Sequence, residues 1–286
     1  MNAPAAGLDH LRDWIGRTEE RIDRITPTPI AALGATLDLD GVNTTPGAEV
    51  PPLWHWLYFI PLARASEIGP DGHPKRGGFL PPVPLPRRMW AGGRLEFRRP
   101  LTIGAEITRV SRIRDVSIKP GRSGTLVFVT VDHEISDGAG VAIHEEHDIV
   151  YRENPQPGAA APQPQRAATD EAFRREIAPD PVLLFRYSAL TFNGHRIHYD
   201  RPYVTEVEGY PGLIVHGPLI ATLLLDLLHR SLPAARVARF SFRAVRPVFD
   251  IHRFTVCGKP GTDRSVALWT RDHEGMLTME ADAQLA

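Results

Sequence analysis

The sequence lacks several features that define large classes of proteins. It has one cysteine, Cys257, among its 286 residues, so it cannot form an intramolecular disulfide, as expected of a protein from a reducing compartment. Its formal net charge of -1 provides no broad positive field for a nucleic acid. Its first residues, MNAPAAGLDH, contain neither the basic nor the apolar segment of a secretion signal. We therefore expect a cytoplasmic protein that binds no nucleic acid.

Long apolar stretches are also missing. The longest, Leu213 to Leu228, is interrupted by His216, Pro218 and Asp226, which predicts a buried helix and not a membrane span. The Gly-x-Ser-x-Gly nucleophile motif and the glycine-rich phosphate loop are absent as well. These absences argue against a membrane protein, a serine hydrolase of that type and a P-loop nucleotide-binding enzyme.

The chain alternates proline-rich loops with segments of regular pattern, and it contains 27 prolines. Residues 8–25 carry apolar side chains at roughly helical spacing and predict an amphipathic helix. Residues 29–37 predict a shorter helix. Segments rich in Val, Ile and Thr predict strands, at 95–97, 106–113, 123–136 and 141–152. The Asp137 to Gly140 segment predicts a hairpin turn between the last two strands.

The chain divides into two similar halves. A segment rich in Pro, Ala and Gln, residues 154–168, predicts a linker between a domain at 1–153 and a domain at 169–286. Two local matches occur in the same order in both halves, and such matches indicate a duplicated unit. The matches pair Arg98–Leu101 with Val245–Val248, and Val131–Glu134 with Arg271–Gly275. From the residues alone, the expected class is α+β with two similar domains.

Two stretches of the second half resemble a known family. Residues 187–200 read YSALTFNGHRIHYD, and residues 209–219 read GYPGLIVHGPL. The first resembles the signature of MaoC-like and (R)-specific enoyl-CoA hydratases, and the second resembles the start of their central helix. The sequence of the first stretch is similar to that of one branch of the family. This branch includes hydroxyacyl-thioester dehydratase type 2 and the bacterial itaconyl-CoA and mesaconyl-C4-CoA hydratases. Residues 51–56 and 87–93 also resemble that branch.

The resemblance implies a tandem (double) hot-dog fold, in which each antiparallel sheet wraps around a central helix. It also implies that the second domain is catalytic, and that the first serves as scaffold and as a wall of the substrate channel. His198 matches the family's catalytic histidine, Asn193 the position of its catalytic aspartate, and Gly217 the glycine whose N–H binds the thioester carbonyl. No cofactor is implied.

The chemistry of hydration suits these residue types. Water must be activated to attack Cβ and a proton must reach Cα, and histidine titrates near neutrality. The carbonyl oxygen gains negative charge, which the free N–H groups of a helix N-terminus stabilise. Because an amide cannot act as a base, His198 must move the protons, and Asn193 orients the water or binds the hydroxyl. Pro218 suits the first turn of that helix.

Four neighbouring residues are candidates for substrate binding: His195, Arg196, His216 and Pro218. His195 and Arg196 replace the family's asparagine-proline pair. His195 fits equally a supporting role behind the catalytic residues, and His216 fits equally a histidine of the loop or core.

Metal binding is not expected. His195, His198 and Asp200 could form a metal cluster, but the family resemblance implies no metal. Residues 144–147 read HEEH, which is not the spacing of zinc proteases.

The function expected from these features is reversible hydration of a short-chain 2-enoyl-CoA by a homodimer, with mesaconyl-C4-CoA and itaconyl-CoA as candidate substrates. The free carboxylate of such a substrate requires a cation, and the candidates are Arg196, Arg87, Arg88 and Arg246. A hot-dog thioesterase and a non-catalytic acyl-CoA-binding module are the alternatives. A hot-dog thioesterase usually uses an acidic residue for hydrolysis, and the combination of Asn193 and His198 therefore argues against a thioesterase. The presence of both His198 and Gly217 argues against the binding module.

Overall fold

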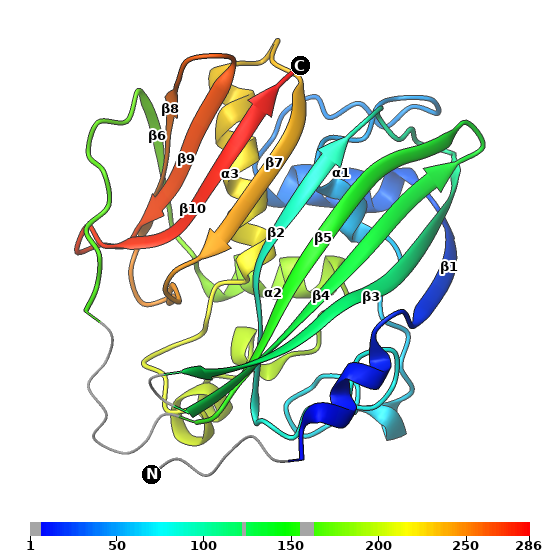
Figure 1. Cartoon of the computed structure of the whole chain (residues 1–286). Coiled ribbons are helices and arrows are strands. Elements are labelled where there is room, and N and C mark those ends of the chain that lie inside the picture. The colour runs from blue at the N-terminus through cyan, green and yellow to red at the C-terminus, as the bar shows by residue number, and fades with distance from the viewer. Residues whose placement is uncertain (1–6, 122–123, 155–162) are drawn as a thin grey trace.

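One antiparallel sheet forms the centre of the molecule (Figure 1). The computed structural model describes residues 7–121, 124–154 and 163–286. The described residues form a ten-stranded sheet in the order β1-β3-β4-β5-β2-β7-β10-β9-β8-β6. The strands are β1 (Thr18–Arg24), β2 (Arg87–Phe97), β3 (Glu106–Gly121), β4 (Gly124–Asp137), β5 (Gly140–Arg152), β6 (Phe173–Ile177), β7 (Val237–Ala244), β8 (Phe254–Pro260), β9 (Ser265–Arg271) and β10 (Leu277–Leu285). Strands β1 to β5 make one half of the sheet and β6 to β10 the other.

The two halves join through a close contact between β2 and β7. A Cβ atom on Gly92 would lie 2.5 Å from the carbonyl oxygen of Phe242, and one on Gly93 would lie 3.0 Å from that of Glu146. Only glycine lets β2 fit between β7 and β5 at this point, where the β2 register also shifts between Trp90 and Gly92. The sheet therefore runs without interruption from one half to the other.

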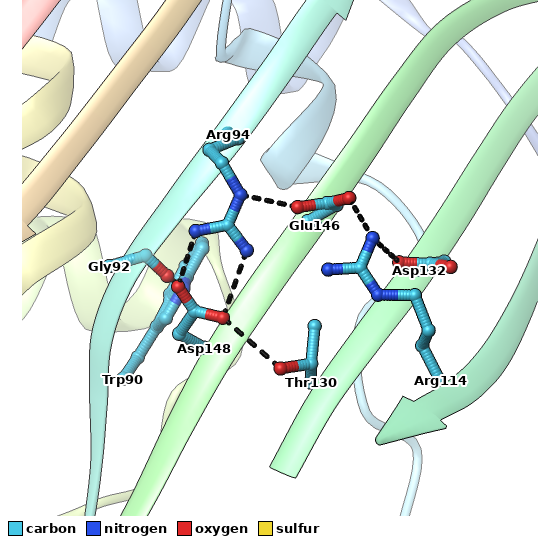
Figure 2. Close-up of polar contacts among 8 residues, drawn as sticks. All are labelled: Trp90, Gly92, Arg94, Arg114, Thr130, Asp132, Glu146 and Asp148. Atoms are coloured by element: carbon cyan, nitrogen blue, oxygen red, sulfur yellow. Dashed lines mark hydrogen bonds and ion pairs between the residues drawn. The ribbon is translucent and has the colours of Figure 1, made fainter. Parts of the chain in front are cut away.

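The outer face of the first half is charged. Figure 2 shows Arg94 of β2 bound to Glu146 and Asp148 of β5, with Arg94 Nη1 2.6 Å from Asp148 Oδ2. Arg114 of β3 bonds to the same Glu146 and lies 3.6 Å from Asp132 of β4. Exposed ion pairs of this kind contribute little each, but they show that this face is solvated. The opposite face of the sheet must then pack against the helices.

The helices lie on that inner face. They are α1 (Pro27–Thr36), α2 (Pro181–Leu190), α3 (Gly217–Ser231), the 3₁₀ helices η1 (Asp9–Trp14), η2 (Trp54–Leu57), η3 (Ala65–Glu67) and η4 (Arg196–His198), and the π-helix η5 (Tyr203–Val207). Helix α3 is buried from Leu219 to Leu228 and contacts β6, β8, β9 and β10. Its one buried charge, Asp226, pairs with Arg175 at 2.6 Å and Arg230 at 2.9 Å. In the described part of the chain, no helix is long and apolar enough to cross a membrane.

Most of the predicted elements are confirmed, but the helix predicted at residues 8–25 is wrong. Within residues 8–25 only η1 is helical. Gly16, at φ +87°, follows this short helix, and β1 then forms an edge strand paired with β3. Leu11 and Ile25 are fully buried at the two ends of the segment, whereas Ile22 is 65% exposed. Because these apolar residues do not share one helical face, their spacing was compatible with two separate elements.

The two sequence matches have different outcomes. Arg98–Leu101 follows β2 and Val245–Val248 follows β7, so the first match occupies equivalent positions in the two halves. The second does not, because Val131–Glu134 lies within β4 whereas Arg271–Gly275 leads into the β9–β10 turn. The second match is therefore a coincidence of residue types and not a structural repeat.

The linker predicted at 154–168 lies partly outside the described residues, at 155–162. Its last residues bind the second half of the sheet. The N–H of Leu277 donates to Gln165 O, and the N–H of Ala167 donates to Gly275 O. Residues 165–168 therefore pack with the second half. The boundary proposed between the two domains must lie before them.

Candidate active site

The loop after α2 places His198 in the interior. Phe192 adopts φ +49°, the N–H of Asn193 donates to Ser188 O, and the chain then turns into η4. His198 is 7% exposed, and its Nδ1 lies 2.7 Å from the carbonyl oxygen of Ile214. Since a carbonyl oxygen only accepts, Nδ1 must carry the proton. The lone pair of the neutral ring is therefore on Nε2.

A second histidine supports the ring of His198. The rings of His198 and His216 stack 3.7 Å apart at 19°, and Nε2 of His216 lies 2.8 Å from Ser188 Oγ. Burial lowers the pKa of His198 to about 4, and the hydrogen bond to Ile214 opposes this only in part. Burial also lowers the pKa of His216 well below its ordinary range. Both rings are neutral at pH 7, as a base at His198 requires.

The N-terminus of α3 follows His216 directly. Gly217 is the first helical residue and Pro218 lies in the first turn. No residue in the described part of the chain accepts a hydrogen bond from the Gly217 N–H. A Cβ atom on Gly217 would have Trp90 O as its neighbour, at 3.9 Å. Strand β2 of the first half therefore borders the start of this helix, where the free N–H and the helix dipole favour negative charge.

Asn193 is half-buried, five residues before His198, and its side chain stabilises the loop. Its Oδ1 accepts the backbone N–H of His195 at 3.0 Å. The side-chain amide group has no hydrogen-bond acceptor among the residues that the structure describes. Asn193 therefore holds the turn with its oxygen and keeps two donor hydrogens for another partner.

A segment of the first half, residues 69–75, packs against this loop. A Cβ atom on Gly72 would lie 1.8 Å from Gly194 O, and Gly72 has φ +89°. The N–H of Arg196 donates to Asp71 O at 2.9 Å, and its Nη1 donates to Pro70 O, also at 2.9 Å. The two halves of the chain thus meet at the candidate active site as well as in the sheet.

Three side chains gather where this segment meets the loop. Asp71 Oδ2 lies 3.1 Å from His73 Nδ1, and the rings of His73 and His195 are 3.9 Å apart. One donor atom from each of Asp71, His73 and His195 lies within 4.8 Å of the others, a geometry that could hold a metal ion. Burial raises the pKa of Asp71, but the hydrogen bonds from the ring and backbone of His73, together with the charges of His73 and His195, outweigh it, so that the pKa of Asp71 lies below the ordinary range. Burial lowers the pKa of both His73 and His195.

The metal cluster considered from the sequence is not brought together. His198 Nδ1 is taken by Ile214 O, and Asp200 bonds to Arg196 and to the N–H of Tyr203. His195 instead lies beside residues of the first half.

The candidate substrate-binding residues are placed as follows. His195 lies 5.5 Å from His198, ring to ring. Arg196 points its guanidinium at Asp200 and at the ring of Tyr203, 4.0 Å away. His216 is completely buried behind His198, and Pro218 is part of α3. His195 is thus the candidate whose ring lies between His198 and the first half.

The HEEH segment at residues 144–147 belongs to a different cluster. The buried carboxylate of Glu145 bonds to Nε2 of His55 at 2.9 Å, to Nε1 of Trp56 at 2.8 Å and to Nε2 of His147 at 2.5 Å. Burial raises the pKa of Glu145, but these partners outweigh it and hold the pKa well below the ordinary range. The acceptor capacity of Glu145 is used within the first half, as in a structural network.

Sequence reasoning missed two residues of the first half, Asp71 and His73. They lie more than a hundred residues before the loop that they contact. In the sequence they appear only as an aspartate and a histidine within a segment rich in Pro and Gly. The partner of His198, Ile214, contributes a backbone oxygen, which leaves no trace in the residue type.

Known proteins similar in sequence to this chain act on acyl thioesters according to their names. Residues 53–250 match the family model of hydroxyacyl-thioester dehydratase type 2. The mesaconyl-C4-CoA hydratase of Chloroflexus aurantiacus is 48% identical over 277 residues, covering 95% of this chain and 96% of that protein. The mitochondrial hydroxyacyl-thioester dehydratase type 2 of Schizosaccharomyces pombe is 28% identical, covering 86% of this chain and 88% of that protein.

Solved structures show the same fold. HtdX of Mycobacterium tuberculosis has a TM-score of 0.64 at 20% identity, covering 94% of this chain and 100% of that one. A MaoC-like dehydratase from Phytophthora capsici has a TM-score of 0.68 at 14% identity and covers 98% of each chain. Another M. tuberculosis protein, described as a double hotdog fold, has a TM-score of 0.57 at 14% identity and covers 95% of this chain and 96% of that one. The expected tandem hot-dog fold is confirmed.

Proposed function

The chain belongs to the hydroxyacyl-thioester dehydratase type 2 family, and from that premise we propose that it adds water reversibly to mesaconyl-C4-CoA. It is a hydro-lyase that acts on an acyl thioester. The observation that carries the assignment is that a neutral His198, whose Nε2 has no hydrogen-bond partner among the described residues, stacks on His216, directly before the open N–H of Gly217 at the start of α3.

His198 performs the proton transfer. As the oxygen of water bonds to Cβ, Nε2 takes a proton from that water, and the π electrons of the Cα–Cβ bond move into the thioester as an enolate. The imidazolium then returns a proton to Cα, which restores neutral His198 and the thioester carbonyl. A single group serves both steps because the proton that it takes from water is the proton that it returns to Cα, and its lone pair is available at pH 7 because its pKa lies below that value. Dehydration is the same sequence in reverse.

Gly217 stabilises the enolate oxygen. Its N–H is one of the unsatisfied donors of the first turn, and the positive end of the α3 dipole reinforces it. The absence of a side chain lets the thioester approach the backbone. Such a preorganised donor is worth about a hundredfold or more in rate.

The remaining site residues bind or support the substrate. The free amide hydrogens of Asn193 donate to the attacking water or to the product hydroxyl. His195 lines the acyl site and Arg196 fixes the loop through Asp200 and Pro70 O. His216 supports the ring of His198 from behind, and Pro218 begins α3. In this proposal no metal or cofactor takes part.

The acyl group is the finer part of the proposal. The relative at 48% identity is named for mesaconyl-C4-CoA, which favours this substrate over itaconyl-CoA. In mesaconyl-C4-CoA the Cβ atom carries a methyl group and a free carboxylate, so hydration yields a tertiary alcohol.

The organisation of the protein is proposed with the function. Residues 1–153 act as scaffold and channel wall, 154–168 as linker, and 169–286 as the catalytic half. We further place the protein in the cytoplasm as a homodimer. The buried Cys257 thiol suits a reducing compartment, and the edge strands β1 and β6 offer surfaces for association.

The test is the hydration of mesaconyl-C4-CoA, followed by loss of the ultraviolet absorbance of its conjugated thioester, with thiol release measured in parallel. Replacing His198 by Ala should lower kcat by about a hundredfold or more and leave thermal unfolding nearly unchanged. His229→Ala, which removes an exposed histidine of α3, is the control and should be fully active. Thiol release without loss of the alkene would identify a thioesterase, and near wild-type turnover of His198→Ala would refute the assignment of the base.

A further inference from the structure

The proposed substrate places a negative charge beside the reacting carbon. Its free carboxylate is attached to Cβ, the atom that water attacks, so this carboxylate must lie close to His198. A carboxylate that leaves water for an enclosed site needs a cationic partner with directed N–H groups, which arginine supplies. The site should therefore contain an arginine that no protein carboxylate already occupies.

Three of the four arginines considered from the sequence are occupied. Arg196 pairs with Asp200 at 2.9 Å, and Arg246 pairs with Asp272 at 3.3 Å. Arg87 donates to the hydroxyl of Tyr210 and to Glu208 O, and its Nη2 lies 3.8 Å from the Glu208 carboxylate. Only Arg88 of the four has no carboxylate partner among the residues that the structure describes.

Another arginine near the cluster, Arg76, is also occupied. Its guanidinium donates to the backbone oxygens of Val83, Leu85 and Pro86, which fixes the loop that leads into β2. Arg76 therefore serves to hold that loop and is not free to bind a ligand.

Arg88 is placed at the site by its strand. It lies two residues before Trp90 in β2, ahead of the register shift, so the two side chains share one face. The backbone of Trp90 borders the start of α3, and Arg88 lies about 7 Å along the strand from it. The partner of Arg88 across the β2–β5 ladder is the buried Tyr151.

The charge of Arg88 also acts on the two histidines. The charge of Arg88 contributes to the lowered pKa of both His73 and His195, after the larger effect of burial. Asp71, the nearby carboxylate, is engaged by the ring and the backbone N–H of His73, both at 3.1 Å. Arg88 is thus a half-buried cation on the same face of β2 as Trp90, and its charge acts on His195, the ring that neighbours His198.

We propose that Arg88 is the receptor for the free carboxylate of the acyl group and that it determines the preference of the enzyme for dicarboxylic acyl-CoA substrates. This inference rests on the proposed function. It assigns a specificity role to the first half of the chain, because β2 supplies the cation while the second half supplies the base and the oxyanion donor.

The experiment separates binding from hydration by using two thioesters that cannot react. In 2-methylsuccinyl-C4-CoA the carboxylate is present, and in isovaleryl-CoA a methyl group takes its place; both lack the double bond. Calorimetric titration of the wild type should give tighter binding of 2-methylsuccinyl-C4-CoA. In Arg88→Met this preference should fall by about a hundredfold, the scale of a charged hydrogen-bonded pair, whereas the affinity for isovaleryl-CoA should stay within about threefold.

Two controls complete the test. Arg253→Met removes an exposed arginine that pairs with Glu176 and should leave the preference unchanged. Arg88→Lys keeps the charge without the planar fork and should retain part of the preference. An equal loss of affinity for both thioesters in Arg88→Met, or an unchanged preference, would overturn the receptor role. If the wild type shows the preference but does not hydrate mesaconyl-C4-CoA, the receptor stands and the proposed reaction falls.

Discussion

The side chain of His198 exchanges protons through one nitrogen only. Its Nδ1–H is held by Ile214 O at 2.7 Å and the ring of His216 covers one face. Because both rings are buried and neutral at pH 7, the Nε2 lone pair is in place before the substrate arrives. The proposed mechanism requires no tautomer change in the free enzyme.

The residue Asn193 gives a prediction with two variants. Asn193→Asp keeps an oxygen that accepts the His195 N–H but replaces the amide hydrogens by acceptors, so the loop should stay folded. We expect Asn193→Asp to retain partial or full activity, because it restores the residue that the family usually has at this position and its carboxylate can orient the water by accepting a hydrogen bond. We expect Asn193→Ala to lower kcat by about tenfold or more with little change in Tm. Steady-state kinetics and thermal unfolding of both variants check this. An active Ala variant beside an inactive Asp variant would contradict the role proposed for this position.

At the scale of residues, the sequence could predict only candidates that lie within one local motif. His198, Asn193 and Gly217 lie within 25 positions, and the spacing of a loop followed by a helix constrains such residues directly. The contact of His195 with Asp71 and His73 depends on tertiary packing between segments far apart in the chain. No local pattern contains that information.

Among the elements, residues 69–75 have the clearest mechanical role. They carry no strand or α-helix, yet they hold the loop of His198 through Asp71 O and Pro70 O. The contact is between backbones, at the paired glycines Gly72 and Gly194. Any side chain at this contact must displace one segment from the other.

Gly72→Ala tests this contact. The added Cβ would meet Gly194 O at 1.8 Å, and φ +89° disfavours any side chain. We expect kcat/KM to fall by about tenfold or more, because small displacements of catalytic groups are costly, with only a modest change in Tm. The matched control is Gly78→Ala, whose Cβ has no atom within 4 Å. Equal activity of the two variants would show that the 69–75 segment does not position the loop.

The predicted and observed elements differ at the edge strand β1, at β2, of which only residues 95–97 were predicted, and at α2, which was not predicted. The strands β3 to β5 are rich in Val, Ile and Thr, and helix α3 is strongly apolar. These elements could therefore be predicted from their residues. Strand β1 pairs on one side only, with β3, and its charged sequence has no apolar alternation to distinguish it from a helix. Its pairing partner, and not its own residues, decides its conformation.

For the whole molecule, the buried histidines predict loss of stability in mild acid. Burial lowers the pKa of His133, His198 and His216 below the ordinary value of 6.5. The unfolded chain therefore binds more protons than the folded one once the pH falls below 6.5, so the free energy of unfolding decreases as the pH falls. The slope is about 1 kcal/mol per pH unit for each such histidine. Tm should change little from pH 7.5 to about 6.5 and drop from there to pH 5.5, and a Tm that stays constant below pH 6.5 would contradict neutral burial of these rings.

The second half of the chain depends on its contacts with the first half. Residues 169–286 contain the base and the oxyanion donor, but their strand β7 pairs with β2 and their loop packs on residues 69–75. Expressed alone, this fragment should be inactive or insoluble because an apolar face is exposed. Co-expression with residues 1–153 should restore hydration of the enoyl-CoA. Full activity of the isolated fragment would refute the division of roles.

The β2–β7 junction also determines how the enzyme responds to dilution. Two separate hot-dog subunits must find each other, so the fraction assembled falls with concentration. Here the partner is on the same chain, and its effective local concentration stays in the millimolar range however dilute the solution. Specific activity should therefore remain constant down to nanomolar enzyme, whether or not whole chains associate further.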